Sequence, residues 1–95
     1  MEYYDVAKFK VSDVFSITNR GMAVAGEIIT GEINNGNYLK LSLEDKELIY
    51  KIGSVEFLKT ETAANIALLI KSDSNPELYY LERTIGQPLI ILALT

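Results

Sequence analysis

The stretch RGMAVAGEIITGEINNG, Arg20 to Gly36, carries glycine at Gly21, Gly26, Gly31 and Gly36, a regular interval of five residues. Glycine is used where the backbone turns with positive φ, forms a bulge or passes close to other backbone. Four glycines separated by MAVA, EIIT and EINN therefore indicate a strand that is bracketed by turns and bent in its middle. We expect the first to end a turn, the second to bend the strand, and the last two to flank the next hairpin.

Several segments of the chain alternate between apolar and polar residues, which is the pattern of half-buried β-strands. The alternation breaks near Asp13, where a bulge would account for it. Gly53 interrupts it again, so the segment around this glycine is either two short strands or one bent strand. IALLI, residues 66–70, is apolar on both faces, as a strand in the interior seam of a closed barrel would be. The alternating segments are VAKFKV (6–11), YLKLSL (38–43) and ELIYKI (47–52).

Turn signals separate these segments. NNGN, residues 34–37, is typical of the turn in a β-hairpin. An Asn-Pro pair at residues 75–76 and a later Gly86 are start and stop signals for a helix, so we expect a short helix or helical turn near residues 75–84. The final segment, PLIILAL, begins at Pro88 and reads as a last strand, because proline fits at the start or on the edge of a strand.

Six or seven short strands with turn signals between them predict an all-β fold, a small closed antiparallel barrel. Closure is favoured because it hides strand edges that a chain this apolar would otherwise expose to aggregation. A length of 95 residues allows a core for one domain and not for two, so residues 1–95 are expected to form a single barrel domain.

Composition limits the chemistry that this chain can perform. It has no cysteine and no histidine, which removes thiolate nucleophiles, zinc sites of the Cys/His kind and the commonest general base near neutral pH. No nucleophile–base pair or metal constellation can be assembled from the remaining residues. We therefore expect a protein that is not an enzyme and that has no catalytic residue, no metal and no cofactor.

Charge and hydropathy limit the partners. The chain has 13 acidic and 9 basic residues, a net charge of −4, which disfavours binding driven by nucleic-acid phosphates. Its longest apolar run, PLIILAL, is far shorter than the roughly 20 residues that cross a bilayer, so no membrane contact is expected. The N-terminal MEYYDVAKFK lacks the pattern of a signal peptide, which predicts a cytoplasmic location.

The segment DVFSITNRGMAVAGEIITGEINNG, Asp13 to Gly36, resembles the second domain of translational GTPases of the elongation factor Tu type. The similarity runs without a gap from about Phe9 to Lys71 and resumes at IGQPL, Ile85 to Leu89. In that family the domain is a Greek-key β-barrel whose glycines serve tight turns and a strand bend. The family binds nucleotide through a separate domain with a G-x-x-x-x-G-K-[ST] loop, and nothing here matches that loop, so we expect no nucleotide binding and no GTPase activity.

The resemblance also implies a binding site. In the elongation factor this barrel holds the 3′ end of aminoacyl-tRNA, with the terminal adenine against aliphatic side chains and a glutamate near its ribose. Carried over position by position, the aliphatic wall falls on Ile17, Ala23 and Leu69, the glutamate on Glu56 and a neighbouring basic residue on Lys59. Stacking a base on an apolar surface and bonding its hydroxyls is a physically reasonable use of such residues.

Some positions depart from the family pattern. Glu27 stands where the elongation factors often carry arginine, and an insertion between Lys71 and Gly86 contains Tyr79 and Tyr80. These changes favour a non-enzymatic binding or adaptor module that contacts a protein, with an RNA-binding module that engages tRNA ends or the ribosome as the alternative. Arg20 and the two tyrosines are the candidate partner surface, since exposed aromatic and arginine side chains are enriched at interfaces.

Overall fold

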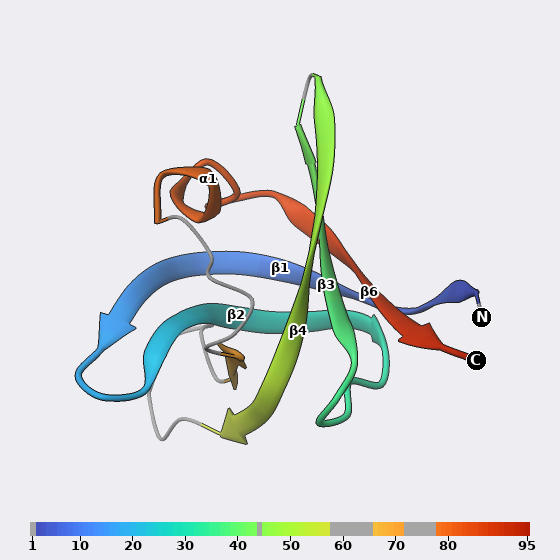
Figure 1. Ribbon diagram of the computed structural model, residues 1–95, viewed down its shortest axis with the longest axis horizontal. Helices are drawn as coiled ribbons and strands as arrows, with labels where there is room; N and C mark the ends of the chain where they lie inside the picture. The colour runs from blue at the N-terminus through green and yellow to red at the C-terminus, as the bar shows by residue number, and fades with distance from the viewer. Residues whose placement is uncertain (1, 44, 58–65, 72–77) are drawn as a thin grey trace.

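The structure of the protein, a computed structural model, describes residues 2–43, 45–57, 66–71 and 78–95, with only the backbone of Leu78 and Tyr79. These residues form strands that lie side by side and one short helix (Figure 1). The elements in chain order are β1 (Tyr3–Ile17), β2 (Gly21–Gly31), β3 (Tyr38–Leu43), β4 (Lys46–Phe57), β5 (Ile66–Ile70), α1 (Leu78–Glu82) and β6 (Pro88–Leu94).

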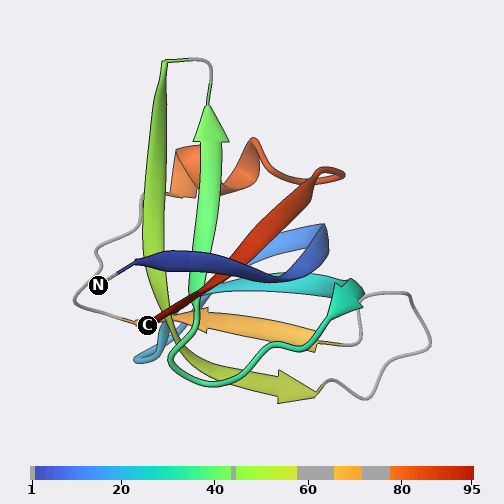
Figure 2. The ribbon, with the colours of Figure 1, turned by 90° about the vertical axis from the view of Figure 1, so that its right-hand side faces the viewer.

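The strands close into an antiparallel barrel in the order β1-β2-β5-β4-β3-β6, which confirms the predicted all-β fold. β3, β4 and β5 are consecutive neighbours in the sheet. β2, which precedes them in the chain, pairs with β5 at the other side of this group, and this arrangement is a Greek key. Figures 1 and 2 show the β3–β4 hairpin crossing β1 and β2 at a steep angle and projecting past them at one end. The two termini lie together on the side of β6.

The hairpin predicted around residues 34–37 is wrong. β2 pairs with β1 and β5, and β3 pairs with β4 and β6, so this loop joins strands that are not neighbours. The local turn itself is present, because the Asn34 N–H donates to Asn37 Oδ1 at 2.8 Å and Gly36 has a φ of 88°. A turn sequence determines how the chain bends and leaves open which strands then pair.

The barrel interior is filled by alternate side chains from every strand, as closure requires. All five residues of β5 are buried, which confirms the expectation for IALLI. Phe9 is the largest of the completely enclosed side chains. The other large side chains of the enclosed set are Val11, Val24, Leu39, Leu41, Ile52, Leu68, Leu81 and Ile91.

Two predicted irregularities are confirmed. The register between β1 and β2 shifts between Val11 and Asp13, which is the expected bulge. β4 is one bent strand, with a shift of register at Gly53. Gly26 of β2 lies opposite Val11 of β1. A Cβ at Gly26 would sit 1.9 Å from the Lys10 carbonyl oxygen, so the close approach of the β1 and β2 backbones at this position requires glycine.

The short helix α1 packs over β1 (Figure 1). Leu81 from this helix is fully buried in the core. The turn after it is held to β1, because the Gly86 N–H donates to Val11 O at 2.8 Å and the Val11 N–H to Gln87 O at 3.1 Å. The predicted helix near residues 75–84 is thus confirmed over α1, and its predicted start at residues 75–76 lies outside the described residues. In the described part of the chain, the helix is too short to span a bilayer.

Candidate functional site

The first candidate surface lies beside the turn between β1 and β2. The Arg20 N–H donates to Ile17 O at 3.0 Å, and Asn19 adopts a φ of 65°, which gives a tight turn. Next to it is a hollow of about 650 Å³, which we call the turn hollow. Its walls are residues 16–21 of the turn, Gly53 and Ser54 of β4, and residues 69–71 at the end of β5.

An ion pair between Arg20 and Glu56 lies beside the turn hollow. Arg20 Nη1 donates to Glu56 Oε1 at 3.2 Å and Nη2 donates to Oε2, so the guanidinium and carboxylate meet in the two-bond geometry that arginine favours. The Ser54 hydroxyl donates to the same Oε2 at 3.2 Å. Three of the roughly four acceptor positions of this carboxylate are therefore occupied within the chain.

The electrostatics of this pair follow from its hydrogen bonds. The hydrogen bonds from Arg20 lower the pKa of the Glu56 carboxyl, partial burial opposes this effect, and the Ser54 hydroxyl adds to the lowering. The same pair raises the pKa of Arg20. Both groups are ionised at neutral pH. Because the pKa of Glu56 is lower in the folded protein, the stabilisation from the pair is present at neutral pH and is lost as the pH falls below about 4.5, the ordinary value of such a carboxyl.

The ion pair also bridges strands. Arg20 immediately precedes β2 and Glu56 is on β4, with β5 between these two strands. Glu56 lies opposite Ala67, which lies opposite Ala25. Both alanines are buried, and the Arg20 side chain reaches Glu56 across β5. The pair therefore connects the β1–β2 turn to the far side of β5.

The structure brings together most of the residues that the resemblance assigned to a tRNA end. Ile17 and Leu69 line the turn hollow, and Glu56 lies at its edge through its bonds to Arg20 and Ser54. Ala23 lies opposite Leu69 in the sheet and is completely buried, so it is not part of the hollow's wall. Lys59 lies outside the described residues.

The two tyrosines of the insertion are in α1. Tyr80 is half-buried and packs against the core, and Lys46 Nζ at the hairpin end donates to its hydroxyl at 2.8 Å and lies 4.3 Å from its ring centroid. This contact ties α1 to the β3–β4 hairpin. The side chain of Tyr79 lies outside the described residues, and contact of either tyrosine with a partner stays a prediction.

A second candidate surface lies at one end of the barrel, where β4 stops. Phe57 is the last residue of β4, lies opposite Ile66 and is 82% exposed. It borders a hollow of about 610 Å³, which we call the barrel mouth. The apolar part of its wall also includes Ile28, Ile33, Val55 and Ile66, and the β2–β3 loop contributes polar groups. From the sequence alone, the alternation of apolar residues in β4 would place Phe57 on the side that faces the core. The alternation does not show where the core ends, and in the structure Phe57 lies beyond it.

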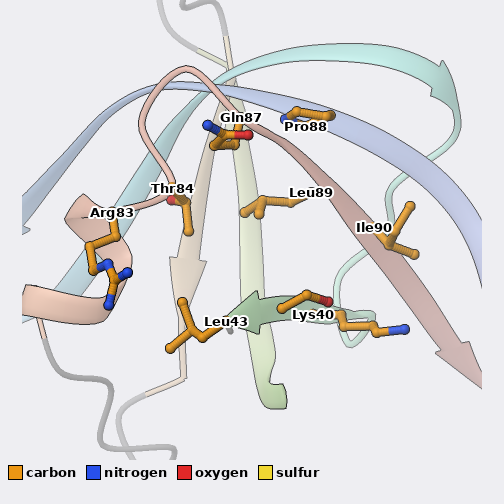
Figure 3. Close-up of a pocket in the computed structure, with 9 residues that line it drawn as sticks. Lys40, Leu43, Arg83, Thr84, Gln87, Pro88, Leu89 and Ile90 are labelled. Carbon is orange, nitrogen blue, oxygen red and sulfur yellow. The ribbon is translucent and has the colours of Figure 1, made fainter. Parts of the chain in front are cut away.

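A third hollow, of about 240 Å³, lies where β3 and β6 separate (Figure 3). The two strands pair only from Tyr38 to Lys40, and the rest of β3 diverges from β6. Thr84, Leu89 and Leu43 form its wall, and the Lys40 side chain extends away from Arg83. This hollow is the smallest of the three, and none of the predicted site residues lines it.

The comparisons with known proteins add no assignment. No protein-family model matches the chain, and no curated protein is similar enough to match it. Among the residues that the structure describes, no group of three or more aspartate or glutamate side chains is arranged to hold a metal ion.

Proposed function

We propose that the chain is a non-catalytic binding module, a translation-factor type of β-barrel that acts as an adaptor in the cytoplasm and contacts a protein through the barrel mouth. The observation that carries this proposal is Phe57, a large apolar side chain that is 82% exposed beside a hollow with a partly apolar wall. Large exposed apolar groups at a concave surface mark contact sites more often than isolated exposed residues do.

Several features of the barrel mouth suit a protein partner. Aromatic side chains are enriched in the centre of interfaces, and an aromatic anchor that becomes buried supplies much of the binding free energy. One hydrogen bond joins the β2–β3 loop to β4 beside the barrel mouth, because the Val55 N–H donates to Asn35 Oδ1 at 2.9 Å. A contact that restrains the loop reduces the entropy that binding costs.

The resemblance to the elongation factor barrel supports an adaptor role and gives the second candidate, RNA binding in the turn hollow. The convergence of Ile17, Leu69 and Glu56 favours that candidate. Against it, the Glu56 carboxylate already accepts bonds from Arg20 and Ser54, so a ribose hydroxyl would have to compete with them. We therefore place the protein-binding role first.

The first test compares binding partners of the wild-type chain with those of Phe57→Ala. We expect nuclease-treated cell extract to yield a protein that binds the wild type and is lost from the variant. With that protein purified, calorimetry should show Kd weakened by about thirty-fold, which corresponds to the roughly 2 kcal/mol of an aromatic hot spot.

The matched control is Ile85→Ala, which removes an apolar side chain that is 44% exposed outside the barrel mouth. It should bind the purified partner as the wild type does. Equal Kd values for wild type and Phe57→Ala would exclude the barrel mouth as the contact surface.

The second candidate predicts binding of deacylated tRNA that weakens as salt is raised from 50 to 200 mM and weakens further in Glu56→Ala. The control is Glu82→Ala, which removes an exposed carboxylate at the end of α1, away from the turn hollow. A titration that detects no binding at tens of micromolar, or that gives both variants the same affinity, would remove the tRNA-end hypothesis and leave the protein-contact proposal in place.

A further inference from the structure

Lysines that are far apart in the sequence share one outward face of the barrel. Lys8 and Lys10 alternate in β1 with buried residues, so their side chains point outward. β6 lies between β1 and β3, and Ile90 of β6 is opposite both Lys8 and Lys40. Residues opposite one another in a sheet point to the same side. We call this surface the lysine face and define it by Tyr3, Lys8, Lys10, Tyr38, Lys40 and Lys51.

Two tyrosines continue the lysine face toward β4. Tyr38 lies opposite Lys51, whose Nζ is 5.9 Å from the Tyr38 ring centroid. The Tyr3 ring meets the Tyr38 ring edge-on, with centroids 5.2 Å apart and planes at 76°. Tyr3 itself is 45% exposed. The surface therefore presents an accessible aromatic ring next to cationic side chains.

The lysine face is positive although the chain as a whole has a net charge of −4. Its own carboxylates are Asp5 on β1 and Glu47 on β4, of which Glu47 lies 3.4 Å from Lys40 Nζ. Glu27 of β2 lies at the border, opposite Lys10. Lysines outnumber carboxylates on this face, so an anionic partner meets a local field opposite in sign to the net charge.

We propose that the lysine face binds single-stranded nucleic acid, with phosphates against the lysines and a base stacked on Tyr3. Neighbouring strands lie about 4.8 Å apart, so the backbones of Lys8 and Lys40 are about 10 Å apart across β6. Ile90 lies between them, and Ile49, which is opposite Lys40, is 40% exposed. A positive surface with aromatic and apolar platforms between its cations suits the alternation of phosphate and base along a single strand.

A single strand fits this face better than an acidic protein segment does. An acidic segment would use the lysines and leave the exposed Tyr3 ring without a stacking partner. A rigid duplex hides its bases and offers only phosphates. A strand with unpaired bases uses both kinds of group, because every base has a face that can stack on an aromatic ring.

The test is fluorescence anisotropy with labelled twelve-nucleotide oligo(U) and oligo(dT) and the full chain. We expect a Kd of about 10–100 µM, in the range of sequence-independent binding. If three phosphates are neutralised, raising the salt from 50 to 200 mM should weaken binding by about fifteen- to twenty-fold, from the slope for single strands. Tyr3→Ala should weaken binding at least about fivefold, because the stacked base loses its platform.

The double variant Lys8→Glu/Lys40→Glu, which reverses both charges, should weaken oligonucleotide binding at least about tenfold and reduce the dependence of Kd on salt. The double variant Lys8→Gln/Lys40→Gln, which removes the charges without adding new ones, should give an intermediate loss. Lys71→Glu is the matched control, because Lys71 is exposed and lies at the turn hollow instead of the lysine face. It should bind as the wild type does, and circular dichroism should show every variant folded.

Four results would overturn the proposal. The first is no binding of either oligonucleotide at 200 µM protein and 50 mM salt, which is twice the upper end of the roughly 10–100 µM range expected for Kd. The second is equal affinity for a duplex of the same length, and the third is a loss of affinity in Lys71→Glu equal to that of the Lys8 and Lys40 variants. The fourth is tighter binding of a glutamate-rich peptide, which would assign the face to an acidic protein. Phe57→Ala should leave oligonucleotide binding unchanged, so this test is independent of the barrel mouth.

Discussion

Gly26→Ala is expected to destabilise the barrel by about 3 kcal/mol or more, at the upper end of what overpacking costs. The added Cβ would lie 1.9 Å from the Lys10 carbonyl oxygen and 2.9 Å from its carbon. These are backbone atoms that cannot rotate away, so β1 and β2 would have to separate. The free energy of unfolding from urea titration measures the effect.

Gly53→Ala is the matched control for this substitution. Its Cβ would have an ordinary contact of 3.6 Å to Leu69 O, and its backbone is outside the left-handed region. We expect a change within about 0.5 kcal/mol. If Gly26→Ala and Gly53→Ala lower the free energy of unfolding equally, the backbones of β1 and β2 do not approach as closely at Gly26 as the structure has them. If Gly26→Ala does not fold while Gly53→Ala does, the prediction holds in its extreme form.

Phe9→Ala is expected to lower the free energy of unfolding by about 3–5 kcal/mol, the usual cost of removing a buried aromatic ring. Phe9 is 0% exposed and points into the barrel from β1, where its ring also contacts the position that a Cβ on Gly26 would take. The cavity left behind is walled mainly by the closed sheet, so little of it can collapse. Since small domains unfold with only about 5–15 kcal/mol, this variant should melt at a much lower temperature.

Phe57→Ala provides the comparison, because it removes the same side chain from a site that is 82% exposed. It should change the free energy of unfolding by no more than about 0.5 kcal/mol. A loss comparable to that of Phe9→Ala would show that Phe57 belongs to the core, and the barrel mouth could then not be a contact surface.

The candidate site was only partly predictable from sequence. The turn at Arg20 and the strand that carries Glu56 could be recognised along the chain, and Ile17 and Leu69 do meet at one hollow. The ion pair between Arg20 and Glu56 could not be foreseen, because Arg20 precedes β2 and Glu56 is on β4, and β5 lies between these two strands. Whether a carboxylate is available to a ligand depends on such pairings.

The lysine face shows the same limit more clearly. Along the chain the basic residues look scattered, and the excess of acidic residues disfavours nucleic acid. The order of strands places β6 between β1 and β3, and this puts Lys8 and Lys40 on either side of Ile90. Net charge is a sum over the chain, whereas binding depends on the local field at one face.

Local backbone preferences and alternation determined most of the fold: the strands, the bulge near Asp13, an irregularity at Gly53 and the short helix follow from residues close together in the sequence. The tertiary structure decided that the turn at residues 34–37 joins strands that do not pair, that Phe57 extends beyond the core, and that the lysines share a face. The physical reason is that turn chemistry and side-chain alternation act over a few residues, while register and strand order arise from burying all the apolar faces at once.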